Sequence, residues 1–266
     1  MPEETTAPDV GLRTEDRGFV RILTLDRQHR ANALTPELMD ALSGAVVEAN
    51  YDPQIRVIVI TGAGDRAFCS GGDLKELRGR DAAGDTFRNP MSGRNRFFLE
   101  IIMESVKPTI AAINGAAVAG GFELANACDL RVAVEGAQFG LPEAKRGMGA
   151  HFSTVVLPRL IPRAIALELL FTGDYVDDAF MAKWGYLNRV VPQGQALEAA
   201  LELAQKIAGN APVTVRRMKE TATKANGLPT ATALRLNEGM DPYLSEDRAE
   251  GVRAFVEKRD PDWKGK

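Results

Sequence analysis

The sequence predicts an α/β core followed by a region made of helices alone. Apolar runs rich in β-branched residues alternate with amphipathic segments over the first two-thirds of the 266 residues, a pattern typical of layered α/β domains. Beyond about residue 158 almost every segment has helical spacing. We therefore expect a core over residues 17–205 and a helical C-terminal region over 206–266. A polar, acidic stretch, 1–16, is expected to be a flexible N-terminal tail.

The strands of the core are expected where β-branched and other apolar residues gather. These runs are 18–25, 56–62, 108–115 and 130–134. Thr35 and Pro36 supply an N-cap hydroxyl and a proline at the first helical position, so a helix is predicted from there to about Asn50. Further helices are predicted over about 97–106, from 120 onward, and over 162–171, 177–184, 195–208, 212–225, 230–237 and 246–259.

Two loops that follow predicted strands carry paired glycines, Gly71-Gly72 and Gly120-Gly121. Without Cβ atoms the backbone of such a loop can approach a ligand closely. A helix is predicted to begin at the second pair, and its first amides lack intrahelical partners and lie at the positive end of the helix dipole. Such amides can hold a developing oxyanion. The alternative is a helix packed tightly on a sheet, with Glu123 pointing into solvent.

Two carboxylates accompany these loops. Glu123 stands one turn into the second predicted helix, and Glu143 follows Pro142, which fixes the local backbone. Two carboxylates beside a two-donor oxyanion hole would form a general acid/base pair for proton transfers next to a thioester carbonyl. The residues are compatible with this chemistry without requiring it.

Composition argues against several other classes of protein. A net charge of -3 is unlike that of a general nucleic-acid or membrane-surface binder. No apolar run approaches the roughly 18 residues that a membrane span needs. The histidines, His29 and His151, have no other ligand types at metal spacing, so no metal site is expected. Cys69 and Cys128 are expected to be buried, reduced thiols of a cytoplasmic protein.

Three segments stand out in chain order: AFCSGGDL at 67–74, AINGAAVAGGFEL at 112–124 and AQFGLPE at 137–143. They are followed by LPRLI at 157–161, WGYLNRVV at 184–191 and EGVRAF at 250–255. In these segments the chain resembles the crotonase (enoyl-CoA hydratase/isomerase) superfamily, and the likeness extends from about Gly18 to the end.

The resemblance implies a spiral core of ββα turns and a C-terminal helical region that makes trimers, commonly paired into hexamers. It implies an acyl-CoA substrate, with no separate cofactor because coenzyme A is part of that substrate. The backbone N–H groups of Gly72 and Gly120 would hold the thioester oxygen. Positions matched to the coenzyme A moiety are Arg30, Ala31, Asp73, Leu74, Lys75 and, near the C-terminus, Lys258. For Arg30 and Lys258 a solvated surface charge is an equally good interpretation.

Glu123 and Glu143 match the acid/base glutamates of the hydratases in this superfamily. The resemblance therefore implies a lyase that adds water to, or removes it from, the 2,3 double bond of an acyl-CoA. Glu123 would help deprotonate the water and Glu143 would supply the proton to Cα.

One turn departs from the family pattern. After Glu143 the hydratases usually carry a glycine-rich turn, whereas this chain has His151 and Phe152 in a run about one residue shorter. The segment FGLPEAK at 139–145 also resembles the corresponding sequence of carnitinyl-CoA dehydratases within the family. Other acyl-CoA reactions (isomerase, hydrolase or C–C lyase) and a non-catalytic binding protein of the same fold stay open. His151 is either an added acid/base group or a structural residue.

Overall fold

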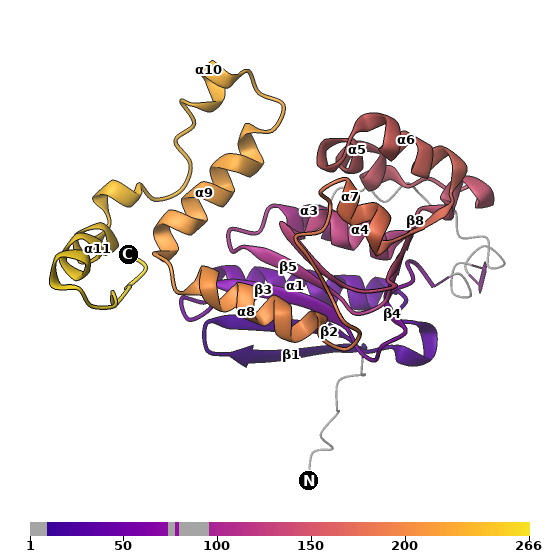
Figure 1. Cartoon of the computed structure of the whole chain (residues 1–266), viewed down its shortest axis with the longest axis horizontal. Helices are drawn as coiled ribbons and strands as arrows, with labels where there is room; N and C mark the ends of the chain where they lie inside the picture. Colours follow the sequence, from indigo (N-terminus) through magenta and orange to yellow (C-terminus); the bar gives the residue numbers. More distant parts are fainter. Residues whose placement is uncertain (1–9, 74–77, 80–95) are drawn as a thin grey trace, which may run out of the picture.

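The computed structural model describes residues 10–73, 78–79 and 96–266, and two β-sheets form its centre (Figure 1). The larger sheet has the strand order β1-β2-β3-β5-β7-β10 and the smaller one β4-β6-β8-β9. The bounds of the larger sheet are β1 Leu12–Arg17, β2 Val20–Leu25, β3 Val57–Gly62, β5 Thr109–Ile113, β7 Leu130–Val134 and β10 Arg189–Val191. Those of the smaller sheet are β4 Ala67–Cys69, β6 Ala116–Val118, β8 Gln138–Gly140 and β9 Tyr175–Asp177.

The chain alternates between the sheets as it advances. The successive pairs β3 and β4, β5 and β6, and β7 and β8 each place one strand in the larger sheet and the next in the smaller. Within each sheet these strands run parallel. Each turn therefore adds its second strand beside the previous one in the smaller sheet, and the predicted α/β spiral of ββα repeats is confirmed.

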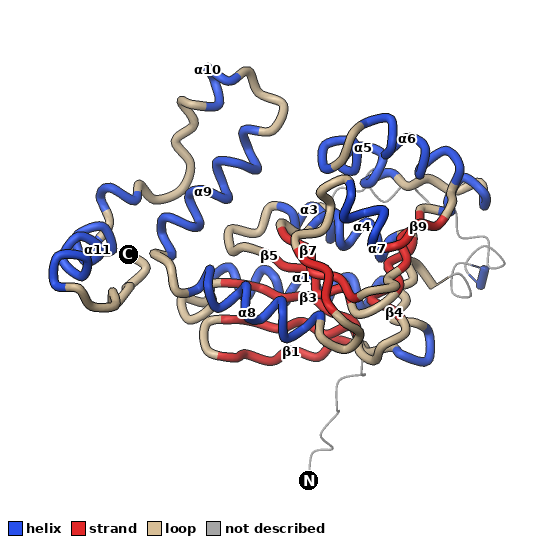
Figure 2. The backbone as a smooth tube through the Cα atoms, viewed as in Figure 1, coloured by secondary structure: helices blue, strands red, loops and turns tan. Residues whose placement is uncertain are grey.

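The helices surround the sheets, and Figure 2 shows them on both sides of the larger one. The helix α8 lies on β3, β5 and β7, while α1 and α3 pack together elsewhere in the core. The helix bounds are α1 Pro36–Tyr51, α3 Phe98–Met103, α4 Gly120–Ala127, α5 His151–Leu160, α6 Arg163–Thr172, α7 Asp178–Lys183, α8 Ala196–Ala208, α9 Pro212–Ala225, α10 Thr230–Ala233 and α11 Glu246–Glu257. Three 3₁₀ turns are η1 Gln28–Arg30, η3 Pro142–Arg146 and η4 Pro242–Leu244.

Two predicted elements show how local sequence sets this frame. All six residues of β3 are buried, as expected of a parallel strand covered on both faces. The helix α1 begins where predicted, because the Thr35 hydroxyl accepts a hydrogen bond from the N–H of Leu38 at 3.3 Å. It positions the loop before it, which carries η1, beside the end of β4.

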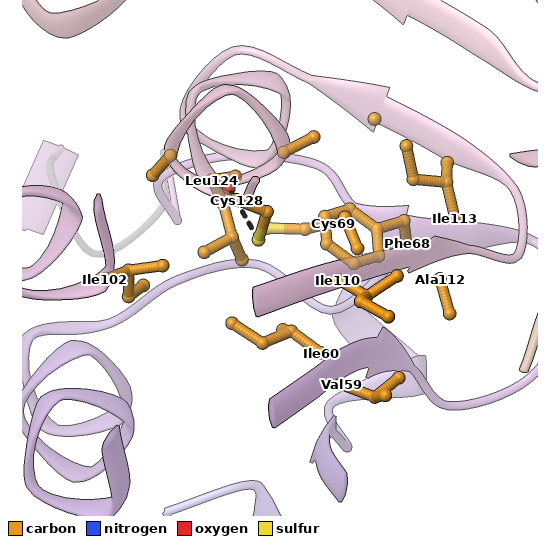
Figure 3. Close-up of a cluster of buried hydrophobic side chains, with 14 of the residues drawn as sticks. Val59, Ile60, Phe68, Cys69, Ile102, Ile110, Ala112, Ile113, Leu124 and Cys128 are labelled. Atoms are coloured by element: carbon orange, nitrogen blue, oxygen red, sulfur yellow. Dashed lines mark hydrogen bonds between the residues drawn. The ribbon is translucent and has the colours of Figure 1, made fainter. Parts of the chain in front are cut away.

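The core between the larger sheet and α4 is apolar and contains both cysteines (Figure 3). Cys69 and Cys128 are free thiols, as predicted, and burial raises the pKa of each to about 12. The Cys128 Sγ–H donates to the carbonyl of Leu124 at 3.5 Å, which ties this residue, the first after α4, to the last turn of that helix. Neither sulfur is therefore a nucleophile at neutral pH.

Two predictions of secondary structure are corrected, and the strands of the smaller sheet were not predicted. The expected tail, 1–16, is wrong in its last residues, because β1 pairs antiparallel with β2 from Leu12. Charged residues fill this edge strand, and it has no apolar alternation to announce it. The three-residue strands of the smaller sheet are too short to show a period. The helix α5 begins at His151 and contains Pro158, whereas the turn there was expected to precede the helical region.

The helices α9, α10 and α11 reach away from the sheets toward one end of the molecule (Figure 1). The core ends with α8, which runs to Ala208. Lys219 joins α9 to the core, since its Nζ lies 2.7 Å from the carboxylate of Asp129 and donates to the Lys107 carbonyl at 2.9 Å. Both lysines are buried. This contact is one fixed attachment of the C-terminal region.

Candidate active site

The two glycine loops meet where β4 and β6 end side by side. Gly71 has a φ of +90°, and a Cβ there would lie 2.7 Å from the Cβ of Ala119 and 3.0 Å from the amide nitrogen of Gly120. A Cβ on Gly120 would lie 3.7 Å from the amide nitrogen of Gly72. The structure thus brings the predicted pair, Gly72 and Gly120, together, and the approach depends on the absence of side chains.

Both amides are open to a ligand. Among the residues that the structure describes, neither the Gly72 nor the Gly120 N–H has a protein acceptor. Gly120 is the first residue of α4, and Ala119 before it takes an unusual backbone conformation with φ 52° and ψ -127°. The Ala119 N–H donates to the carbonyl of Gly140 at 2.8 Å, which holds this strained residue in place. Two neighbouring free N–H groups at a helix N-terminus suit a developing oxyanion.

Glu123 lies one turn further along α4 and is half-buried rather than in solvent. Its Oε1 accepts a hydrogen bond from the backbone N–H of Ser153 at 3.0 Å. Burial raises the pKa of Glu123 to about 7; the nearby charge of Glu143 acts in the same direction, and the amides of Ser153 and Phe152 oppose it. This carboxyl can therefore exchange a proton near neutral pH.

Glu143, in η3, is only 6% exposed, and its Oε2 has no hydrogen-bond partner in the described part of the chain. Burial raises the pKa of Glu143, while the charge of Arg146 lowers it. A buried carboxyl oxygen without a partner is costly in a native structure and marks a place for a proton, a water or a ligand. The charge of Glu143 also raises the pKa of Glu123, which indicates that the two carboxyls lie near each other.

The segment that carries η1 lies against the loop that follows β4. Ala31 accepts a hydrogen bond from the N–H of Ser70 at 3.1 Å, and the carbonyl of Arg30 accepts one from the Ser70 hydroxyl at 3.3 Å. Asp73 forms an ion pair with Arg27 at 3.3 Å. The predicted coenzyme A positions Arg30, Ala31 and Asp73 therefore adjoin Gly72.

The other predicted positions for coenzyme A are Leu74, Lys75 and Lys258. Leu74 and Lys75 lie outside the described residues. Lys258 ends α11 at the opposite end of the molecule from β4, so the chain does not bring it to its own Gly72 and Gly120 (Figure 1). Its distance from the site reflects the outward course of α9 to α11.

The unusual turn after Glu143 opens α5. His151 is exposed at the first position of this helix, while Phe152 and Ser153 are buried. The residues beside Glu123 that sequence reasoning missed are Ser153 and, from α4 itself, Asn126. A polar residue three positions after Glu123 in an otherwise apolar helix was the available signal for Asn126.

The described residues form neither a metal site nor a membrane-spanning helix. In residues 10–73, 78–79 and 96–266, no group of three or more histidine, cysteine, aspartate or glutamate side chains is placed to hold a metal ion. None of the helices in the same ranges has the length and apolarity that crossing a membrane requires.

A spiral of ββα turns that brings two glycine loops together at the strand ends is the architecture of the crotonase class of α/β proteins. Residues 15–266 match the model of the enoyl-CoA hydratase/isomerase family, and the chain belongs to this family.

Characterised relatives agree with this assignment. The chain is 39% identical over 257 residues to a carnitinyl-CoA dehydratase of Salmonella heidelberg, covering 94% of this chain and 96% of the relative. Among solved structures, an enoyl-CoA hydratase from Mycobacterium tuberculosis superposes with a TM-score of 0.86 at 35% identity, covering 96% of this chain and 99% of the other. An enoyl-CoA hydratase from Bacillus anthracis gives a TM-score of 0.86 at 34% identity, covering 96% and 100%.

Proposed function

We propose that this protein is a lyase acting on acyl-CoA thioesters. It either adds water across the 2,3 double bond or removes water to form that bond. The observation that carries the proposal is the difference between its two carboxyl groups. Glu123 accepts a hydrogen bond from Ser153, whereas the buried Oε2 of Glu143 has no partner among the described residues. Glu123, whose pKa burial raises to about 7, has a donor for its anion and can lose its proton near neutral pH, whereas Glu143 has a buried oxygen suited to hold a proton.

The proposed reaction uses both groups and the two amides. The thioester oxygen accepts hydrogen bonds from the N–H groups of Gly72 and Gly120, which stabilise the enolate charge that develops on it. In hydration Glu123 takes a proton from water, the hydroxide oxygen bonds to Cβ, and Glu143 delivers its proton to Cα. Dehydration is the reverse: Glu143 removes the Cα proton and Glu123 protonates the departing hydroxyl.

The acyl group has two candidates. The solved relatives favour a simple trans-2-enoyl-CoA, and the dehydratase relatives, at 39% identity, favour a carnitinyl-CoA. Arg30, Ala31 and Asp73, with Leu74 and Lys75 beyond them, are proposed to contact the coenzyme A moiety. For Asp73 this contact would come from the backbone, because its carboxylate faces Arg27.

The test is to offer the purified protein crotonyl-CoA, a longer trans-2-enoyl-CoA and carnitinyl-CoA, and to follow the conjugated enoyl absorbance. Its loss with the first two, or its gain with the third, supports the lyase and identifies the acyl class. Binding of all three esters without either change would point to the isomerase, hydrolase or C–C lyase alternatives. No binding would contradict the enzyme proposal in favour of a crotonase-fold binding protein, for which salt-dependent nucleic-acid binding is the next test.

We further propose a homotrimer, or a hexamer of paired trimers, assembled through the C-terminal helices. The support is a set of large apolar side chains, one directly after α10, one in η4 and one in α11, that one chain leaves exposed. Leu234 is 78% exposed, Leu244 85% and Phe255 85%. Light scattering on the purified protein should give three or six times the mass of one chain, and a monomer would contradict the assembly.

A further inference from the structure

Behind Glu123 lies a buried chain of polar groups from three separate segments. The Tyr186 hydroxyl donates to Asn126 Oδ1 at 2.7 Å, and Asn126 Nδ2 donates to Ser153 Oγ at 2.9 Å. Ser153 in turn donates its backbone N–H to Glu123 Oε1 at 3.0 Å. Their exposed fractions are 1% for Tyr186, 3% for Asn126 and 0% for Ser153. Three buried polar side chains in one connected series are unusual in an apolar core and call for a role.

The direction of the donors in this series is fixed. Asn126 accepts through its oxygen and donates through its nitrogen, so a phenol on one side sets the Ser153 hydroxyl as acceptor on the other. A serine hydroxyl has one proton, which is then left to donate elsewhere. The Ser153 N–H already donates to Glu123 Oε1 at 3.0 Å, and the Ser153 side chain also lowers the pKa of that carboxyl, so the remaining hydroxyl proton is directed toward Glu123. Glu123 and Asn126 stand three positions apart on α4, so both can form hydrogen bonds with Ser153 from the same face of that helix.

A positive charge closes the far end of the series. The guanidinium of Arg131, which is 6% exposed, lies 4.6 Å from the centroid of the Tyr186 ring, and its Nε donates to the Tyr186 carbonyl at 2.8 Å. Phe122 and Phe139 contact the same ring edge-on. Burial raises the pKa of the phenol, so Tyr186 keeps the proton that it donates. The ring cannot turn away, and the series runs from a cation to a carboxylate.

The other charged groups on the elements around Glu123 do not stabilise its ionised form. Glu143, from η3, opposes ionisation of Glu123. Glu100 of α3 and Glu104, directly after α3, pair with Arg96. On α5, His151 is exposed and Arg159 donates to the Val155 carbonyl. The strands β4 and β6 carry no charged residue. No cation from these elements contacts Glu123 within the described residues, so the groups that favour its anion are the Ser153 and Phe152 amides and the Ser153 side chain.

We propose that Ser153 is a positioning residue that orients Glu123 and favours its ionised, proton-accepting form, and that Asn126 and Tyr186 set the direction of the Ser153 hydroxyl. The proposal rests on the proposed function only in giving Glu123 a proton to accept. It explains why this chain has a serine at the start of α5, where the turn departs from the glycine-rich pattern.

The experiment compares Ser153→Ala with Ser105→Ala. Ser105 is a matched control, because it is 1% exposed and hydrogen-bonded to Asn50 at 2.8 Å, outside the series. In Ser153→Ala the backbone N–H remains, so only the hydroxyl is lost. The acid limb of kcat/KM for the enoyl substrate should move upward by about half to one pH unit. Tyr186→Phe, which keeps the ring, should move it the same way by less, and Ser105→Ala should not move it.

A second measurement tests the role of Ser153 without depending on the proposed catalytic function. The ¹³C resonance of the Glu123 carboxyl, assigned by its disappearance in Glu123→Gln, is titrated in the substrate-free protein. An upward shift of its midpoint in Ser153→Ala supports the proposal even if no acyl-CoA is converted. An unmoved or lowered midpoint in folded Ser153→Ala overturns it even if the wild type is an efficient hydratase.

Discussion

The carbonyl oxygen of Cys69 lies only 2.0 Å from the point where a Cβ on Gly121 would stand. The start of α4 thus rests directly on the end of β4, and no side chain fits between them. Because this contact sets the separation of the Gly72 and Gly120 amides, Gly121→Ala should lower the free energy of unfolding by about 1–3 kcal/mol or more. Turnover should also fall in the protein that still folds. Denaturant unfolding and a steady-state assay would measure the two effects.

The control for this substitution is Gly44→Ala. Gly44 is exposed in the middle of α1, and a Cβ there would meet nothing within 4 Å. The change should stabilise the protein by roughly 0.5–1 kcal/mol, since alanine is the better helix former. Equal stability of the two variants would contradict the packing argument.

Glu143→Gln should reduce turnover by roughly 10²- to 10⁴-fold, because the proposed general acid is removed. The amide occupies nearly the same volume, so binding of the acyl-CoA ester should survive. Calorimetric titration with the ester would measure binding, and a steady-state assay on the same preparation would measure turnover. Wild-type turnover in this variant would take Glu143 out of the mechanism.

The pH dependence of kcat/KM should have an acid limb near pH 7, set by Glu123, whose pKa burial raises to about 7. Below that pH the carboxyl is protonated and cannot accept a proton from water in the hydration direction. The limb is measured from initial rates between pH 5 and 9 in buffers of constant ionic strength, and a flat profile down to pH 5 would contradict the assignment of Glu123 as base.

Glu123 should also make stability depend on pH. Its pKa in the folded protein, about 7, exceeds the ordinary value of 4.5, so between these values the folded state holds more protons than the unfolded one. The free energy of unfolding contributed by this group therefore falls as pH rises from about 4.5 to 7. Glu123→Gln should be more stable than the wild type at pH 8 and nearly equal to it at pH 4, as judged by urea unfolding at the two values. A constant difference would argue against the raised pKa.

Lys219→Met should release α9 from the core. The variant leaves Asp129 without the ammonium that lies 2.7 Å away, and loss of one partner of a buried ion pair costs roughly 3–5 kcal/mol. Lys224→Met is the control on the same helix, because Lys224 is 53% exposed in its pair with Glu238 and should cost at most about 1 kcal/mol. Limited proteolysis between α8 and α9, together with thermal unfolding, would distinguish the two variants.

Several features of the fold followed from the sequence because near neighbours encode them. The buried strand β3, the N-cap at Thr35 and the paired glycines each have a signal within a few residues. The edge strand β1 has no such signal, since its charged residues suit both a tail and an edge, and only pairing with β2 decides between them. Similarly, three-residue strands such as β6 owe their conformation to neighbours far along the chain.

The sequence by itself determined the family and singled out Gly72, Gly120 and the two glutamates as candidate site residues, because their motifs are local and ordered along the chain. Only the tertiary structure decided how the glutamates differ. Glu123 meets the amide of Ser153, thirty positions away, whereas Glu143 keeps a buried oxygen with no partner among the described residues. The physical reason is that burial and hydrogen bonding depend on how α5 packs on α4, and no local pattern records that packing.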